Sequence, residues 1–377
     1  MPGKIQKNSI LGFTFPQSES LHGDRLFILS IALLCAVGIL MVYSSSFYMA
    51  WQDFRNPYYF LKRHSLRLLI GFVAFMAAYK FNYHHLRRWS IIPLIISIIL
   101  LIWVLITGSR WISVGGITLQ PSEFARIALL VYLADWCSRN ANKLRQSPKG
   151  FLFVLTLVMI TTGLVMAEPS YSAAVMILIS GVALLVMSGV KWRYLIAAAL
   201  PILPVAGYMA VAASYRFRRV FSFLNPLADP QGAGYHTIQS KIAVGSGQIW
   251  GFGFGMSGQK FHFLPESHCD FIFSILCEER GFIGAALVLL LFILFFWRGI
   301  RIAVKARDHF GFLLAGSLIF CIAFFALVNI GVALGSLPVT GLPLPFISYG
   351  GSALITNLLA CGIVLNVSKH NNSPELT

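Results

Sequence analysis

Long apolar runs separated by short polar segments dominate this chain. A bilayer core about 30 Å thick needs roughly 20 helical residues to cross it, and apolar runs near that length recur between residues 25 and 367. They lack the alternating pattern of a membrane β-barrel, and lipid cannot satisfy an open backbone, so we expect helices. The pattern predicts ten spans, at about residues 25–47, 66–80, 89–107, 122–137, 151–167, 170–187, 194–213, 268–297, 311–336 and 347–367.

The composition agrees with a membrane location. Hydrophobic residues make up 57% of the chain, charged residues make up 11%, and the mean hydropathy is +0.76, which is far more apolar than a water-soluble domain. No small-x-small cleavage site follows the first run, so we expect it to remain as an anchor. The sequence therefore predicts an all-α integral membrane protein, with a tail at residues 1–24, one ten-helix domain at 25–367 and a tail at 368–377.

The net charge of +16 has to be interpreted from the positions of the basic residues. With the N-terminus placed in the cytoplasm, most Lys and Arg residues fall on the inner side of the membrane, as the positive-inside pattern requires. The main exceptions are Arg55, Lys62, Arg63 and Arg67, around the first outer loop, and the basic residues of the long seventh loop. An even number of spans brings the C-terminus back to the cytoplasm. No nucleic-acid-binding motif accompanies the charge, so we expect no nucleic-acid partner.

One connection is much longer than the others. About 50 residues, 214–267, separate the seventh and eighth predicted spans, and a loop of that size is by default functional. On the predicted topology it is extracytoplasmic, as are the shorter segments 108–126 and 167–174. An unbroken eighth helix from Asp270 to Trp297 would run about 42 Å, longer than the hydrocarbon core. A break near Gly281, or a start above the membrane, would resolve that excess.

Ionisable residues gather on the predicted outer side. Such residues beside spanning segments are costly and indicate function or pairing, and several cations with few carboxylates suit a polyanionic ligand such as a diphosphate. Glu123 and Arg126 share one helical face, so an internal salt bridge is an equal alternative for them. The candidates that could line one cavity are Arg110, Glu123, Arg126, Glu168, Arg216, Arg218, Arg219, Lys241, Lys260 and Asp270, with Glu266 and His268 beside the last.

Several local sequence patterns have simpler interpretations than a ligand-binding or catalytic site. Gly253, Gly255 and Gly258 match a dinucleotide motif, but no strand precedes them, so tight turns are the better interpretation. His262 and His268, with Glu266 and Asp270 nearby, match no standard zinc spacing, and any metal ligands stay undefined. Asp270 could serve only as a helix N-cap, and Glu278 and Glu279 could form a local ion pair with Arg280. The six cysteines suggest neither disulfides nor a zinc site.

Four sequence blocks resemble the signature blocks of the SEDS family (shape, elongation, division and sporulation). They are "QPSEFAR", "EPSYSAA", "LPESHCDFIF" followed by "EERGFIGA", and "GLPLPFISYGGSALITNLLACGIVLN". The matches run in order from about Tyr43 to Asn366, with the family's ten-span spacing. "YSSS", "NPYYFLKRH", "SGQKFHFLPE" and "PFISYGGS" resemble the cell-division branch more than the elongation branch.

The resemblance implies a peptidoglycan glycosyltransferase of the cytoplasmic (inner) membrane that polymerises lipid II at its outer face in septal wall synthesis. It implies a class B penicillin-binding protein and other divisome membrane proteins as partners, and a divalent cation, Mg²⁺ or Mn²⁺, whose ligands are unknown. The family's essential aspartate corresponds to Asp270. Three positions depart from the family pattern: Arg126 replaces a lysine, Ser170 an acid and Cys269 a threonine.

Asp270 would then act as the general base, and Arg110, Arg126 and Arg216 would neutralise the departing diphosphate. A single displacement needs no covalent nucleophile, and we find no Ser-His-Asp set. Three alternatives remain: a lipid II flippase or transporter, whose polar sites would look similar; a non-catalytic scaffold; and an elongation-type polymerase.

Overall fold

The computed structural model describes residues 24–114, 117–168, 170–211, 221–232, 234–261 and 263–371. Within this part of the chain, ten helices have 17 or more residues, which agrees with the ten predicted spans. They are α1 (Arg25–Phe54), α2 (Tyr59–Lys80), α4 (Ile91–Thr107), α5 (Pro121–Arg139), α7 (Pro148–Ala167), α8 (Tyr171–Met187), α9 (Trp192–Val211), α12 (Ile272–Val304), α13 (His309–Ala333) and α14 (Gly351–Asn371).

Five of these helices are long and apolar enough to cross a membrane by length and composition: α1, α7, α12, α13 and α14. The helices α4 and α8 are apolar but shorter. Large apolar side chains such as Ile99 and Ile106 of α4 lie exposed, as expected of a surface that faces lipid instead of water. The prediction of a helical, multi-span membrane protein is confirmed.

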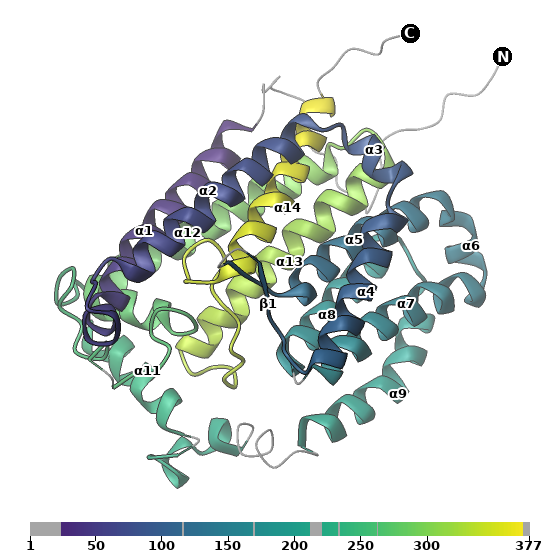
Figure 1. Ribbon diagram of the computed structural model, residues 1–377. Helices are drawn as coiled ribbons and strands as arrows, with labels where there is room; N and C mark the ends of the chain where they lie inside the picture. The colour runs from purple at the N-terminus through teal and green to yellow at the C-terminus, as the bar shows by residue number, and fades with distance from the viewer. Residues whose placement is uncertain are drawn as a thin grey trace.

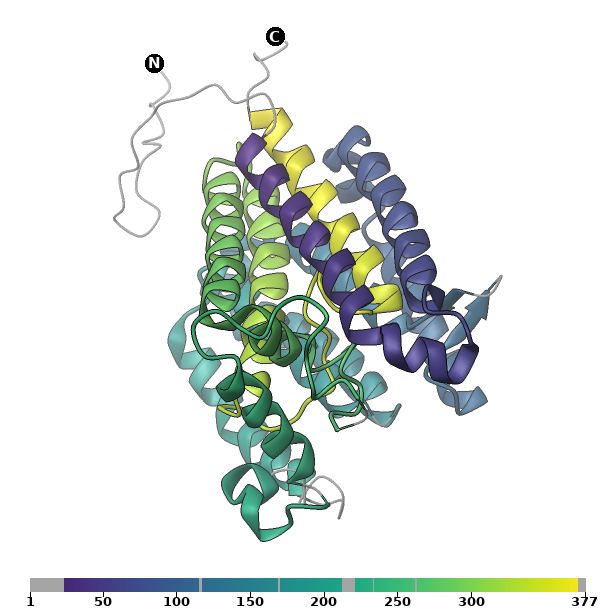
Figure 2. The same ribbon diagram turned by 90° about the vertical axis from the view of Figure 1, so that its left-hand side faces the viewer.

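The helices form one bundle around α13 (Figures 1 and 2). α13 packs against α5, α8, α12 and α14, while α14 packs closely along α2, and α1 along α12. α4, α5, α7 and α8 form the other side of the bundle, and α9 lies at its edge (Figure 1). The core is therefore continuous from α1 to α14.

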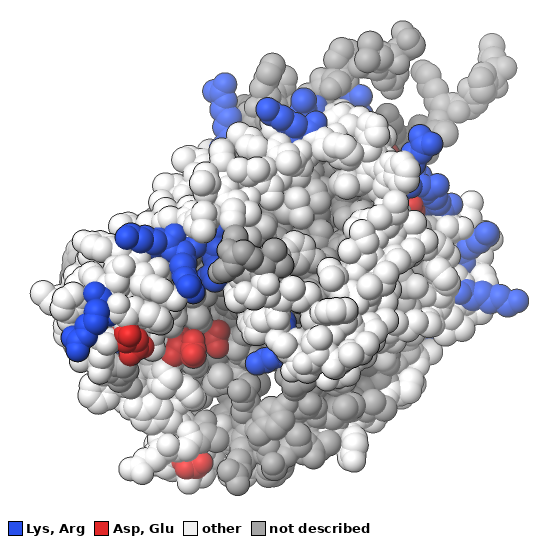
Figure 3. Space-filling model, viewed as in Figure 1, with Lys and Arg blue, Asp and Glu red and all other residues white. Residues whose placement is uncertain are grey.

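Polar contacts define two ends of the bundle. At one end Arg298 Nε meets Asp24 Oδ2 at 2.8 Å, and Tyr83 donates its hydroxyl to Asp308 and its backbone N–H to Asn366. We call this the terminal end, because α1 begins and α14 ends there. The opposite end holds the long connection between α9 and α12 and is called the loop end. Figure 3 shows charged side chains at both ends and a broad uncharged band between them.

Several short elements were not predicted. β1 (Ile112–Val114) and β2 (Ile117–Leu119) form an antiparallel pair in which Ile112 faces Leu119, so the fold is not wholly α. α3 (Tyr83–Arg88) and α6 (Ala141–Gln146) occupy connections at the terminal end. The long connection is not structureless, since it contains η1 (Pro226–Ala228) and α11 (Tyr235–Ser246). The last span runs to Asn371 instead of ending at residue 367.

The eighth span is broken at Gly281, which confirms one of the two expected solutions to its excess length. Gly281 has φ 63° and ψ −162° inside α12, a conformation open essentially to glycine alone. The preceding loop pairs with the break: Phe252 N–H donates to Glu278 O (3.0 Å), and Phe282 N–H donates to Gln248 O (2.8 Å). A Cβ on Gly281 would lie 2.4 Å from Ile249 O. The loop thus supplies the hydrogen bonds that the broken helix lacks.

Candidate active site

A tight turn at the loop end carries Asp270, which is half-buried. The backbone N–H groups of Cys269 and Asp270 both donate to Glu266 O, at 3.0 and 3.1 Å. Glu266 adopts φ 53° to close this turn, a left-handed conformation that is unusual for a residue other than glycine. The N-cap of α12 is Phe271, so Asp270 is not the helix N-cap that was considered as an alternative.

Helix α13 and the segment between α13 and α14 hold this turn by hydrogen bonds from the other side. Asn329 of α13 donates its side-chain amide to Asp270 O at 2.8 Å and to Leu342 O at 2.7 Å. Tyr349 N–H donates to His268 O at 3.0 Å, and the hydroxyl of Ser348 donates to Cys269 O. Asp270 Oδ2 lies 3.5 Å from the position a Cβ would take on Gly341. The carboxylate therefore sits beside a glycine on a backbone fixed by at least four hydrogen bonds.

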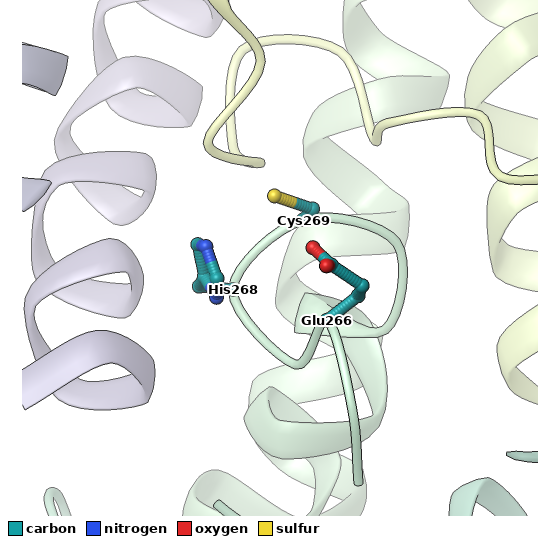
Figure 4. A group of neighbouring side chains, drawn as sticks. All are labelled: Glu266, His268 and Cys269. Carbon is teal, nitrogen blue, oxygen red and sulfur yellow. The ribbon is translucent and has the colours of Figure 1, made fainter. Parts of the chain in front are cut away.

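Glu266, His268 and Cys269 lie together in the same turn (Figure 4), and one ligand atom from each lies within 4.8 Å of the others. Burial lowers the pKa of His268, against the nearby Glu266 carboxylate, and burial raises the pKa of the Cys269 thiol well above its ordinary value. Desolvation disfavours the charged form of each group. Near neutral pH, therefore, the imidazole is neutral and the thiol keeps its proton.

Arg67 of α2 belongs to this region, although sequence reasoning had counted it only as an exception to the charge pattern. Its guanidinium lies over the Tyr349 ring, 4.6 Å from the centroid, and reaches Thr118 Oγ1 at 3.5 Å. It is close enough to Cys269 to oppose the rise of the thiol pKa. Its Nη1 is buried without a hydrogen-bond partner among the described residues. An arginine near the start of the span predicted at residues 66–80 was the signal that could have indicated it.

Glu123 and Arg126 form the internal salt bridge that was the alternative to ligand binding. Arg126 Nη2 lies 2.9 Å from Glu123 Oε2, and both side chains are buried. The guanidinium also donates to Asn357 Oδ1 at 3.2 Å and lies 4.2 Å from the centroid of the Phe325 ring. The pair thus ties α5 to α13 and α14.

The other predicted ligand-binding residues are spread around the loop end. Arg110 is exposed and acts on Glu168, whose pKa burial raises to about 7 against the pull of Arg110. Lys241 is exposed on α11, with its aliphatic stem against Gly335. Lys260 is buried, 3.4 Å from Glu279 Oε1, and it also donates to Gly255 O. Arg216, Arg218 and Arg219 lie outside the described residues.

Glu278 and Glu279 secure the long connection to α12 and do not form the local ion pair with Arg280. Gly258 N–H and the Ser257 hydroxyl donate to Glu278, and the Ser44 hydroxyl of α1 donates to Glu279 Oε2 at 2.7 Å. Arg280 is exposed and lies over the Phe254 ring instead. The ammonium of Lys260 is therefore engaged in holding the loop.

Among the described residues, the group Glu266, His268 and Cys269 is the one that brings three possible metal ligands within 4.8 Å of one another. Mg²⁺ and Mn²⁺ prefer oxygen ligands, whereas thiolate and imidazole favour softer ions such as Zn²⁺. Only one of the three residues offers a carboxylate oxygen. This group therefore does not fit the Mg²⁺ or Mn²⁺ that the resemblance implied.

Comparison with known families identifies the class of protein. Residues 24–373 match the family model described as "Cell cycle protein", that of FtsW, RodA and SpoVE. The chain belongs to this family, the SEDS family.

Individual relatives agree with that assignment. The chain is 39% identical over 353 residues to the probable peptidoglycan glycosyltransferase FtsW of Trichlorobacter lovleyi, covering 92% of this chain and 93% of the relative. It is also 39% identical over 358 residues to the stage V sporulation protein E of Bacillus subtilis, covering 92% and 97%. The relatives named FtsW place the chain nearest to that branch.

Solved structures share the fold. A chain of a peptidoglycan synthase complex that coordinates polymerization and crosslinking superposes with a TM-score of 0.76 at 26% identity, covering 93% of this chain and 99% of that one. The rod shape determining protein RodA of Thermus thermophilus superposes with a TM-score of 0.70 at 24% identity, covering 94% and 99%.

Proposed function

We propose that this protein is a peptidoglycan glycosyltransferase that polymerises lipid II during septal cell-wall synthesis. The relatives with the name peptidoglycan glycosyltransferase FtsW support the reaction class. The observation that carries the site is the half-buried carboxylate of Asp270, on a turn clamped by Asn329, Ser348 and Tyr349 at the loop end. A rigid backbone around one carboxylate suits a base that must be held against a sugar hydroxyl.

The loop end faces the outside of the cytoplasmic membrane in this proposal, and the terminal end faces the cytoplasm. Basic residues such as Arg25, Lys80 and Arg301 lie at or near helix ends on the terminal side. Cytoplasmic loops carry an excess of Lys and Arg. Asp270 then lies at the level where the headgroup of a lipid-linked sugar projects from the outer leaflet.

The reaction is one displacement. Asp270 removes the proton from the 4-hydroxyl of the acceptor sugar as that oxygen attacks the anomeric carbon of the donor. A carbon–oxygen bond forms, the bond to the diphosphate breaks, and its electron pair leaves with the undecaprenyl diphosphate. An α-linked donor gives a β-linked product by inversion, so no covalent enzyme intermediate is required.

Arginine side chains neutralise the negative charge on the departing diphosphate. Arg67 has a guanidinium nitrogen without a partner among the described residues, and Arg110 is exposed; both suit phosphate oxygens because guanidinium binds them in a fixed fork. Arg126 is engaged with Glu123. Glu266 and His268 flank the base as substrate contacts, and Arg216 remains a predicted ligand.

A class B penicillin-binding protein would act as partner, because crosslinking must follow polymerisation. The similar chain in a complex that coordinates the two reactions supports this partner. Other divisome membrane proteins would bind along the apolar flanks of the helices.

The test uses the purified full-length chain with labelled lipid II, with and without the partner. We expect glycan strands from the wild type and a loss of about 10² to 10⁴-fold for Asp270→Asn. Asp53→Asn changes an exposed carboxylate near the loop-side end of α1 and should retain activity. Lipid translocation without polymer would instead identify a flippase, and neither activity would indicate a scaffold.

A further inference from the structure

Three different metal-binding side chains meet in the turn before Asp270. Glu266, His268 and Cys269 offer a carboxylate, an imidazole and a thiol, with one ligand atom from each within 4.8 Å of the others (Figure 4). Bonds of about 2.0–2.3 Å in a tetrahedral zinc site place ligand atoms roughly 3.3–3.8 Å apart. Small side-chain rotations would therefore close the group around one ion.

The backbone already holds these side chains in position. The left-handed conformation of Glu266 lets its carbonyl accept from Cys269 N–H and Asp270 N–H, which turns the chain back on itself. His268 O accepts from Tyr349 N–H, and its ring lies 4.7 Å from that of Phe60. A preformed turn lowers the entropy cost of gathering ligands.

The imidazole of His268 gives an independent indication. His268 is 5% exposed, and its Nδ1 is buried without a hydrogen-bond partner among the described residues. Buried polar nitrogens normally have a partner, so an orphan calls for an explanation. A metal ion bound by the imidazole would provide one.

We propose that this turn binds a soft divalent cation, with Zn²⁺ as the reference ion, through Glu266, His268 and Cys269. Three protein ligands leave a fourth position open to water. On binding, the metal–sulfur bond forms, the thiol proton passes to solvent, and the hydrogen bond from Cys269 Sγ to Tyr349 O (3.2 Å) is lost.

The ion would act on the neighbouring carboxylate. Asp270 follows Cys269 directly, and a bound dication is the largest charge in its surroundings. An ion bound in this turn would lie beside the proposed base, where the acceptor sugar has to approach, so Zn²⁺ is expected to inhibit polymerisation reversibly. This effect rests on the proposed function, whereas metal binding itself does not.

Binding is measured on the full-length wild type with Cd²⁺ and Co²⁺, whose bonds to thiolate give charge-transfer absorption. We expect such a band, its loss in Cys269→Thr, and affinity weakened by more than about 10-fold in Glu266→Gln and His268→Ala. Cys137→Ala, which alters a buried thiol in α5, should keep the band. Absence of the band, or its persistence in Cys269→Thr, overturns the site.

The effect on activity is measured separately, as the ratio of rates with and without Zn²⁺ within each protein. We expect inhibition of at least about 10-fold in the wild type. Activity should return when a chelator removes Zn²⁺, and Cys269→Thr should not be inhibited. A band without inhibition overturns the inhibitory role. Lack of polymerisation by the wild type with Mg²⁺ supplied and Zn²⁺ omitted, with the band intact, refutes the proposed function and leaves the metal site standing.

Discussion

Asn329 of α13 holds the backbone of Asp270, donating its amide to Asp270 O at 2.8 Å and to Leu342 O at 2.7 Å. One side chain therefore fixes the turn of the proposed base and the segment that packs on it.

Replacing Asn329 with leucine should impair catalysis through Asp270. One buried carbonyl, Leu342 O, would lose its donor at a cost of about 1–3 kcal/mol, and the partly buried Asp270 O would lose its donor too, so the turn would shift. We expect kcat to fall by about 10 to 100-fold with a smaller change in KM. Asn140→Ala, at the terminal end, removes a bond to Trp136 O and serves as control. An unchanged kcat for Asn329→Leu would contradict the positioning role.

The pair of Glu123 and Arg126 should show strong coupling in stability. Arg126→Met leaves a buried carboxylate without its cation and should lower the unfolding free energy by about 3–5 kcal/mol. The double variant Glu123→Gln with Arg126→Met should recover much of that loss. Thermal unfolding in detergent measures both. Additive losses in the double variant would show that the two side chains act separately.

Gly281→Ala should release the long connection from α12. The new Cβ would lie 2.4 Å from Ile249 O, in a backbone conformation that costs other residues about 1–3 kcal/mol before any clash. Faster hydrogen exchange at the amides of Phe252 and Gly253 is expected. Gly163→Ala, where an added Cβ meets nothing within 4 Å, is the matched control. Equal exchange in the two variants would argue against the interlock.

Stability should depend on pH through Glu168. Burial raises its pKa from 4.5 to about 7, so between these values the folded state binds more protons than the unfolded state. Stability therefore falls as pH rises across that window and levels off above it. Melting temperatures of wild type and Glu168→Gln, measured from about pH 5 to pH 8, should diverge in slope. Parallel curves would mean that Glu168 is ionised throughout the window.

Much of the fold could be predicted because an apolar run of membrane length leaves few options for the backbone. The exceptions depend on tertiary contacts. Helix α11 lies in polar sequence, and Ser240 fixes it by bonds to Ser274 and Ala333 O. The β1–β2 pair is only three residues long on each side, although its Gly-Gly centre is a hairpin signal.

The candidate site was predictable only in part. Asp270 stood out as a carboxylate in an apolar block that resembles a family signature. Asn329 did not, because its partner is 59 residues away and nothing in the neighbouring apolar sequence indicates that contact. Lys260 was grouped with ligand-binding cations because the sequence cannot show that the loop folds back to Glu279.

The break at Gly281 also bears on how this protein is made. Phe282–Val304 alone extends about 34 Å, enough for a hydrocarbon core of about 30 Å, and it carries no charge before Arg298. Glu278 and Glu279 lie beyond the break, enclosed by the protein. During membrane insertion, the segment after the break can therefore cross the hydrocarbon core without a charged residue. Glu278 and Glu279 do not have to enter the hydrocarbon core without their partners.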